Sequence, residues 1–211
     1  MKLLTFFLSI LYLTSLANAQ LATPNEAGLA YGHVHLNVPN TEEHINIWIE
    51  HFDGELITIG SSIAVKFSNF ILMFDEQAPS LSSVKTAMHH FGFKLRNMAK
   101  FFDKWETAGF DMGPIFTGSE GYTNAYVTLP GGVEVELQED QALYTEFTGY
   151  HIHYSTDGYE ELLAWYNDVF NLETQARGAI QSATNVPGMN LSYGQLGERP
   201  FELGEGPFAA T

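Results

Sequence analysis

Histidines recur at the same position of three similar phrases in the sequence. The phrases begin 57 and 61 residues apart and read His33-Val34-His35-Leu36-Asn37-Val38, His90-Phe91-Gly92-Phe93-Lys94-Leu95 and His151-Ile152-His153-Tyr154-Ser155-Thr156. A repeat at a nearly constant period indicates one supersecondary unit that is used several times. Imidazole nitrogens are common ligands of divalent metals, so the repeated histidines are candidates for a metal site.

Each phrase alternates polar and apolar residues, which is the pattern of a strand with one face in the core. In the first phrase Val34, Leu36 and Val38 share one face, while His33 and His35 share the other. We therefore expect the recurrent histidines to line a cavity on the polar face of a sheet.

Two carboxylates share a face of another predicted strand. Glu134 and Glu136 alternate with apolar residues in the segment 133–139, which follows the turn Pro130-Gly131-Gly132. Such carboxylates are usually solvated, so alone they are a weak signal. The repeated histidines are expected on the same polar face, at corresponding positions of similar strands. Together with them, Glu136 becomes a candidate metal ligand.

A helix is expected after each histidine strand. Asn40 and Asn97 are candidate caps for the first two helices, and Thr156 or Asp157 for the third. His44 and His51 fall on the polar side of the first helix, so we expect them to be solvated.

Short strands are expected after each helix, and together they define a strand–helix–strands unit of an α+β fold. The predicted strands are 56–59, 63–67 and 70–74 in the first unit, a hairpin of 125–129 with 133–139 in the second, and 173–180 with 189–193 in the third.

These motifs resemble those of the vicinal oxygen chelate superfamily, which includes glyoxalases, extradiol dioxygenases and bleomycin resistance proteins. The resemblance covers residues 31–193 and is clearest at 31–52, 88–109 and 122–140. It implies tandem βαβββ modules that pair into a cupped mixed sheet around a divalent metal.

The resemblance implies three metal ligands: His33, His90 and Glu136. Two imidazoles and one carboxylate suit iron(II) or manganese, and zinc is possible. Leu72 stands where a glyoxalase-like site would add a fourth ligand, which brings the ligand set closer to the dioxygenase arrangement and weakens a glutathione-substrate interpretation.

Four neighbours of these ligands are candidates for other roles. His35, His89 and Glu134 could orient the ligands. Tyr126 and His35 are the candidates for a catalytic general base.

The chain is expected to divide into four parts. Residues 1–19 read as a signal peptide with the small residues Ala17-Asn18-Ala19 before the cleavage point, which predicts export to the periplasm or outside the cell. Residues 20–30 form a linker and 31–140 a domain of two paired units. Residues 141–211 form a third unit, half of a second such domain and truncated, so that His151 is expected in an incomplete site.

The composition limits the classes of partner. The chain has 9 Lys and Arg against 25 Asp and Glu, a net charge of −16, and no cysteine. Nucleic acid and anionic membranes are therefore disfavoured as partners. Without disulfides, an exported fold must rest on its core or on a metal.

Two hypotheses for the function remain open. The first is a metal-dependent enzyme acting on a small substrate with vicinal oxygens, either extradiol dioxygenase-like or glyoxalase- and lyase-like. The second is a protein of the same fold that binds or sequesters a small molecule without turnover. A homodimer through the third unit would cover the sheet edge that an unpaired unit leaves open.

Overall fold

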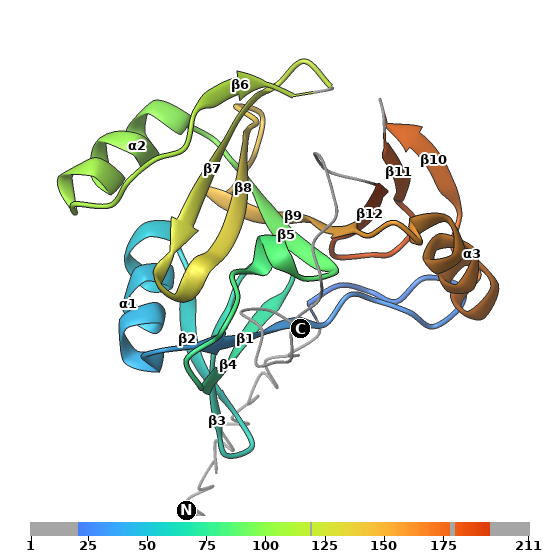
Figure 1. Cartoon of the computed structure of the whole chain (residues 1–211), viewed down its shortest axis with the longest axis horizontal. Coiled ribbons are helices and arrows are strands. Elements are labelled where there is room, and N and C mark those ends of the chain that lie inside the picture. The colour runs from blue at the N-terminus through green and yellow to red at the C-terminus, as the bar shows by residue number, and fades with distance from the viewer. Residues whose placement is uncertain (1–20, 119, 178–179, 195–211) are drawn as a thin grey trace, which may run out of the picture.

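A computed structural model describes residues 21–118, 120–177 and 180–194 (Figure 1). The expected signal peptide and the chain after Gly194 lie outside the described residues. The described elements are β1 (His33–Val38), α1 (Thr41–Phe52), β2 (Glu55–Ile59), β3 (Ser62–Lys66), β4 (Ile71–Glu76), β5 (Met88–Leu95), α2 (Met98–Thr107), β6 (Ile115–Thr117), β7 (Thr123–Leu129), β8 (Val133–Glu139), β9 (Phe147–Ser155), α3 (Tyr159–Phe170), β10 (Thr174–Arg177), β11 (Ile180–Ala183) and β12 (Asn190–Gly194).

The helix starts of the first two units are those that the sequence predicts. The side chain of Asn40 accepts a hydrogen bond from the backbone nitrogen of Glu43, and that of Asn97 accepts one from Lys100. These bonds satisfy amide groups that have no partner within the helix. The third helix differs, because Gly158 precedes it and makes no side-chain cap.

The three units share one strand order. The first unit forms a four-stranded sheet in the order β1-β4-β3-β2, and the second and third follow the same pattern as β5-β8-β7-β6 and β9-β12-β11-β10. In each unit the first strand runs parallel to the last strand. The α+β fold of repeated βαβββ units is therefore confirmed.

The pairing of the units differs from the sequence-based expectation. Strand β5 of the second unit pairs antiparallel with β9 of the third, which joins these units into one eight-stranded sheet. The first unit keeps its own sheet, with β1 at an edge among the described strands. We expected the first and second units, residues 31–140, to pair and the third unit to lack a partner. Instead, the second and third units pair with each other.

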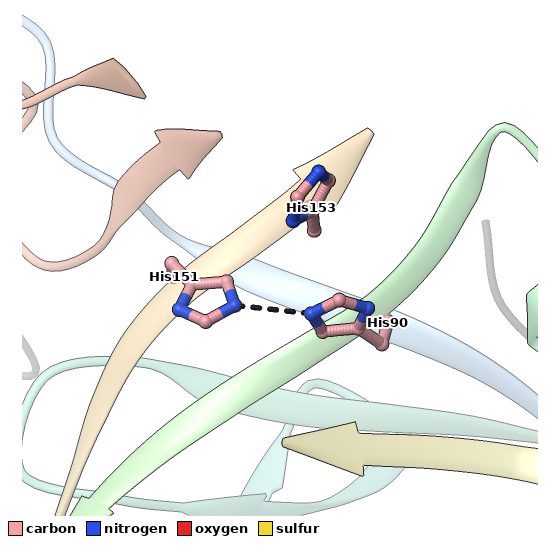
Figure 2. Close-up of side chains that lie close together, drawn as sticks. All are labelled: His90, His151 and His153. Carbon is pink, nitrogen blue, oxygen red and sulfur yellow. Dashed lines mark hydrogen bonds between the residues drawn. The ribbon is translucent and has the colours of Figure 1, made fainter. Parts of the chain in front are cut away.

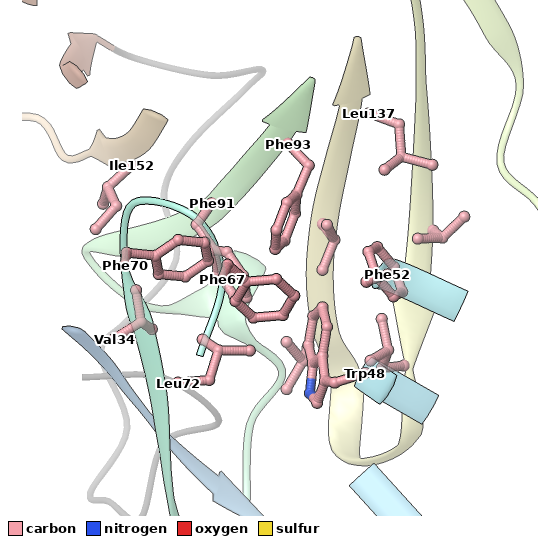
Figure 3. Close-up of a cluster of buried hydrophobic side chains, with 14 of the residues drawn as sticks. Val34, Trp48, Phe52, Phe67, Phe70, Leu72, Phe91, Phe93, Leu137 and Ile152 are labelled. Carbon is pink, nitrogen blue, oxygen red and sulfur yellow. The ribbon is translucent and has the colours of Figure 1, made fainter. Parts of the chain in front are cut away.

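The core lies where α1 and the inner face of the first sheet meet the eight-stranded sheet (Figure 3). Trp48 of α1 is fully buried and its ring centroid lies 5.8 Å from that of Phe91 and 6.0 Å from that of Phe93. Because side chains alternate along a strand, burying Phe91 and Phe93 turns His90 and Gly92 to the opposite face.

The two histidines of α1 are buried, contrary to the prediction. His44 Nε2 lies 2.9 Å from the carbonyl oxygen of Pro130, and the His51 ring stands edge-on to Trp105 at 5.1 Å between centroids. Both are covered because α1 packs against the hairpin turn and α2 as well as against its own sheet. Burial lowers the pKa of His44 to about 4, although its hydrogen bond with Pro130 acts in the opposite direction.

Acidification from pH 7 to pH 5 is expected to weaken the fold partly through His44. The folded-state pKa of about 4 lies below the ordinary value, so the unfolded chain binds more protons in this range and the free energy of unfolding falls as the pH falls. The loss is about 1–2 kcal/mol. Urea unfolding at both pH values, in metal-free buffer, measures it. A His44→Gln variant with the same pH dependence as the wild type would contradict this assignment.

Helices that could cross a membrane are absent from the described part of the chain: none is both long enough and apolar enough.

Candidate metal centre

Three strands bring two histidines and one glutamate together on one face of the eight-stranded sheet, the face opposite the buried side chains of Phe91 and Phe93. His90 lies on β5, Glu136 on the parallel neighbour β8, and His151 on the antiparallel neighbour β9. In the register, Gly92 lies opposite Glu136 on one side and opposite His151 on the other. The ligand candidates therefore surround a glycine at the centre of the sheet.

The donor atoms of these side chains form a small triangle. His90 Nε2 lies 2.9 Å from Glu136 Oε2 and 3.1 Å from His151 Nε2, and His151 Nε2 lies 3.2 Å from Glu136 Oε2. Figure 2 shows the rings of His90 and His151 facing each other, with His153 farther along the strand of His151.

The triangle fits a divalent metal. Bonds of about 2.1 Å at right angles separate neighbouring donor atoms by about 3.0 Å, close to the three distances here. Two imidazole nitrogens and one carboxylate oxygen are also a donor set that iron(II), manganese and zinc accept. These three residues could therefore bind one side of such an ion and leave its other coordination positions open for substrate.

Neighbouring side chains fix the orientation of two ligand candidates. Asn124 Nδ2 donates to Glu136 Oε1 at 2.5 Å, and the Tyr126 hydroxyl donates to Glu136 Oε2 at 3.3 Å. The second ring nitrogen of His90 lies 2.8 Å from His89 Nδ1. Of the three predicted orienting residues, His89 thus contacts a ligand candidate.

The protonation states suit metal binding. Burial alone would raise the pKa of Glu136, but hydrogen bonds with His151 and His90 hold it well below its usual range. Burial lowers the pKa of His90, although Glu136 opposes this. An ionised carboxylate and a neutral imidazole are the forms that bind a metal.

Gly92 makes room for His151. A Cβ atom at residue 92 would lie 2.8 Å from Cε1 of the His151 ring, closer than real contacts allow. The ring therefore occupies the space that any other side chain would fill, which explains the glycine within the phrase His90-Phe91-Gly92-Phe93.

His153 is a third buried imidazole near the triangle. His90, His151 and His153 each offer a nitrogen within 4.8 Å of the others. Its Nε2 is buried without a hydrogen-bond partner. Burial, together with His90 and His151, lowers the pKa of His153 to about 2, so the ring stays neutral and can accept a hydrogen bond or bind a metal.

Ser192 occupies the position that would match Glu136 in the third unit. Gly92 lies opposite Glu136, and His153, the residue equivalent to Gly92 by the 61-residue repeat, lies opposite Ser192. In the first unit the register places Met73, and not Leu72, at this position. A second carboxylate ligand is therefore missing from the equivalent positions of both other units.

The remaining predicted site residues lie in two places. His33 and His35 belong to β1 of the other sheet, where His33 is exposed and His35 Nε2 lies 3.2 Å from Asp75. The structure thus brings His90 and Glu136 together but puts His151 where His33 was expected. Tyr126 lies at the site, while Glu134 is held by Thr128 at 2.7 Å.

The site opens into a cavity of about 210 Å³. Its described lining contains Phe116, Gly118, Glu120, Asn124, Tyr126, Glu136, Gln138, His151, His153, Arg177, Ile180 and Ser192. The Phe116 and Tyr126 rings stack at 5.5 Å between centroids and form one wall.

Comparisons with solved structures identify the architecture. Glyoxalase I from Zea mays matches with a TM-score of 0.62 at 14% sequence identity, over 82% of this chain and 70% of that protein. A putative dioxygenase from Bacillus subtilis matches with a TM-score of 0.62 at 10% identity, over 78% of this chain and 63% of that protein. The chain has the vicinal oxygen chelate fold.

The likeness to these vicinal oxygen chelate structures establishes the fold alone, because the sequence identities are low. No protein-family model matches the sequence, and no curated protein matches it. The function must therefore be argued from the site.

Proposed function

We propose that the chain is a metal-dependent enzyme that acts on a small substrate with vicinal oxygens. The observation that carries this proposal is the triangle of donor atoms formed by His90, Glu136 and His151, which opens into a cavity. We propose iron(II) or manganese as the metal, with zinc as the alternative. A bound metal would hold and polarise the two substrate oxygens.

Extradiol dioxygenase-like chemistry is favoured over glyoxalase- or lyase-like chemistry. Two histidines and one carboxylate on one face are typical of non-heme iron(II) oxygenases, since they leave positions for both substrate and oxygen. Ser192 and Met73 stand at the positions equivalent to Glu136, and neither supplies a second carboxylate.

The residues around the metal would bind and orient the substrate. Burial and the charge of Glu136 raise the pKa of Tyr126, so its hydroxyl stays protonated and serves as a hydrogen-bond donor instead of a base. His153 Nε2 is free to accept a hydrogen bond from a substrate hydroxyl. His35 lies on the other sheet, so the structure gives it no part in this site.

Metal content and turnover test the proposal together. Purified protein is expected to carry one iron or manganese ion per chain and to cleave a catechol only when oxygen is present. Elemental analysis and ring-cleavage absorbance, measured aerobically and anaerobically, check this. Anaerobic turnover would favour the isomerase or lyase alternative. Metal binding without any turnover would favour a non-catalytic protein that sequesters small molecules.

Export and self-association stay proposals of their own. A mature protein that begins at Gln20 would support the signal peptide. A homodimer through the third unit is not needed to cover the edge of β9, because β9 pairs with β5 of the same chain. Light scattering of the purified protein measures the oligomeric state.

A further inference from the structure

Arg177 lies beside the candidate metal centre and carries the one cationic side chain in the described lining of its cavity. It is the last residue of β10, and its Nη1 lies 3.3 Å from Ser192 Oγ. Ser192 in turn lies opposite His153 in the pairing of β12 with β9. In a chain with a net charge of −16, a largely covered arginine at this place calls for an explanation.

Hydroxyl groups of the third unit hold the guanidinium in place. Its Nη2 donates to the Tyr150 hydroxyl at 2.5 Å and its Nη1 donates to Ser182 Oγ at 3.4 Å. The guanidinium carbon also lies 5.1 Å from the centre of the Tyr150 ring. The arginine is thus fixed by the sheet before any ligand arrives.

A carboxylate from the second unit pairs with the edge of the guanidinium that carries Nε and Nη2. Nη2 lies 2.7 Å from Glu120 Oε2 and Nε lies 3.3 Å from Glu120 Oε1, which is the paired geometry that arginine forms with carboxylates. Arg177 is 12% exposed, whereas Glu120 is 32% exposed and stands in the connection between β6 and β7. The arginine is the less exposed partner, and the glutamate is the more accessible one.

We propose that Arg177 is the recognition site for a carboxylate on the substrate, and that Glu120 occupies this site until the substrate replaces it. The substrate class is then a small carboxylate with vicinal oxygens, such as a dihydroxybenzoate. Exchanging one carboxylate for another keeps the paired hydrogen bonds to Arg177, so the exchange costs little. This inference rests on the proposed function for the vicinal oxygens, but the arginine site itself requires no metal.

Binding of 3,4-dihydroxybenzoate and of catechol, titrated by calorimetry, tests the inference, because the two probes differ only in the carboxylate. Zinc-loaded wild-type protein is expected to bind the benzoate about tenfold more tightly than catechol. Arg177→Gln is expected to remove this preference, measured as the ratio of the two dissociation constants. Arg177→Lys should keep part of the preference, because lysine keeps the charge but loses the paired geometry.

Two further variants separate recognition from general charge effects. Glu120→Gln is expected to tighten benzoate binding by about threefold to tenfold, since the competing carboxylate is gone. Arg96→Gln, an exposed site outside the cavity lining, makes the same charge change as Arg177→Gln and should leave the preference intact. Circular dichroism confirms that each variant is folded.

The metal-free protein distinguishes failure of this inference from failure of the proposed function. The benzoate preference should persist there, with weaker binding of both probes. Wild-type protein that takes up no metal would overturn the proposed function, while a benzoate preference in the same sample would still support the arginine site. Equal binding of the two probes by the wild type, or a full preference in Arg177→Gln, would overturn the inference.

Discussion

Replacing His151 by alanine is expected to reduce the affinity for a divalent metal by at least about 100-fold, because one of three converging donor atoms is lost. His151 Nε2 lies 3.1 Å from His90 Nε2 and 3.2 Å from Glu136 Oε2, so it completes the donor triangle. The sequence alone predicts otherwise, because it places His151 in an incomplete site outside the ligand set. Titration of metal-free protein with zinc or manganese measures the affinity.

His33→Ala is the matched control for this variant. His33 is also the first residue of a repeated phrase, but it is exposed on β1 of the other sheet. We expect His33→Ala to bind metal like the wild type and Glu136→Ala to lose metal like His151→Ala. Equal losses in the His33 and His151 variants would show that the triangle is not the metal site.

Gly92→Ala is expected to weaken metal binding by about 10–100-fold while the protein remains folded. The added methyl group would meet the far end of the His151 side chain at 2.8 Å, so the ring must turn away from His90 and Glu136. A side-chain end can move without disturbing the sheet. The loss should therefore appear in metal titrations and much less in the free energy of unfolding of the metal-free protein.

Gly32→Ala provides the comparison for this effect. A Cβ atom at residue 32 would meet nothing within 4 Å, so the substitution adds the same methyl group without a clash. It should change neither metal affinity nor stability appreciably. If Gly92→Ala retained full metal affinity, the position of His151 would not depend on the glycine.

The local elements of the fold follow from the sequence. Apolar residues at every second position predict β1, β5 and β9, and Asn40 and Asn97 mark the helix starts that the structure confirms. These features depend on residues near each other in the chain, so the sequence specifies them directly. The weakest prediction falls in the third unit, where Gly158 precedes the helix instead of Thr156 or Asp157 and no side chain caps it.

Two of the three ligand candidates could also be predicted. His90 and Glu136 belong to one unit, in which parallel pairing of β5 with β8 places Gly92 opposite Glu136. The repeated phrase marks His90, and the alternation of polar and apolar residues in the segment 133–139 marks Glu136. The burial of His44 could not be seen in this way, because it depends on Pro130 in another unit.

Only the tertiary structure decided which unit supplies the second histidine. His33 and His151 occupy the same position of similar strands, and a strand edge offers the same backbone hydrogen bonds to either partner. Packing decides between them. The apolar face of the first sheet and α1 pack against Phe91 and Phe93, while β9 pairs with the edge of β5. The sequence thus determined the repeated unit and its ligand-bearing positions, and the long-range pairing of units determined the site.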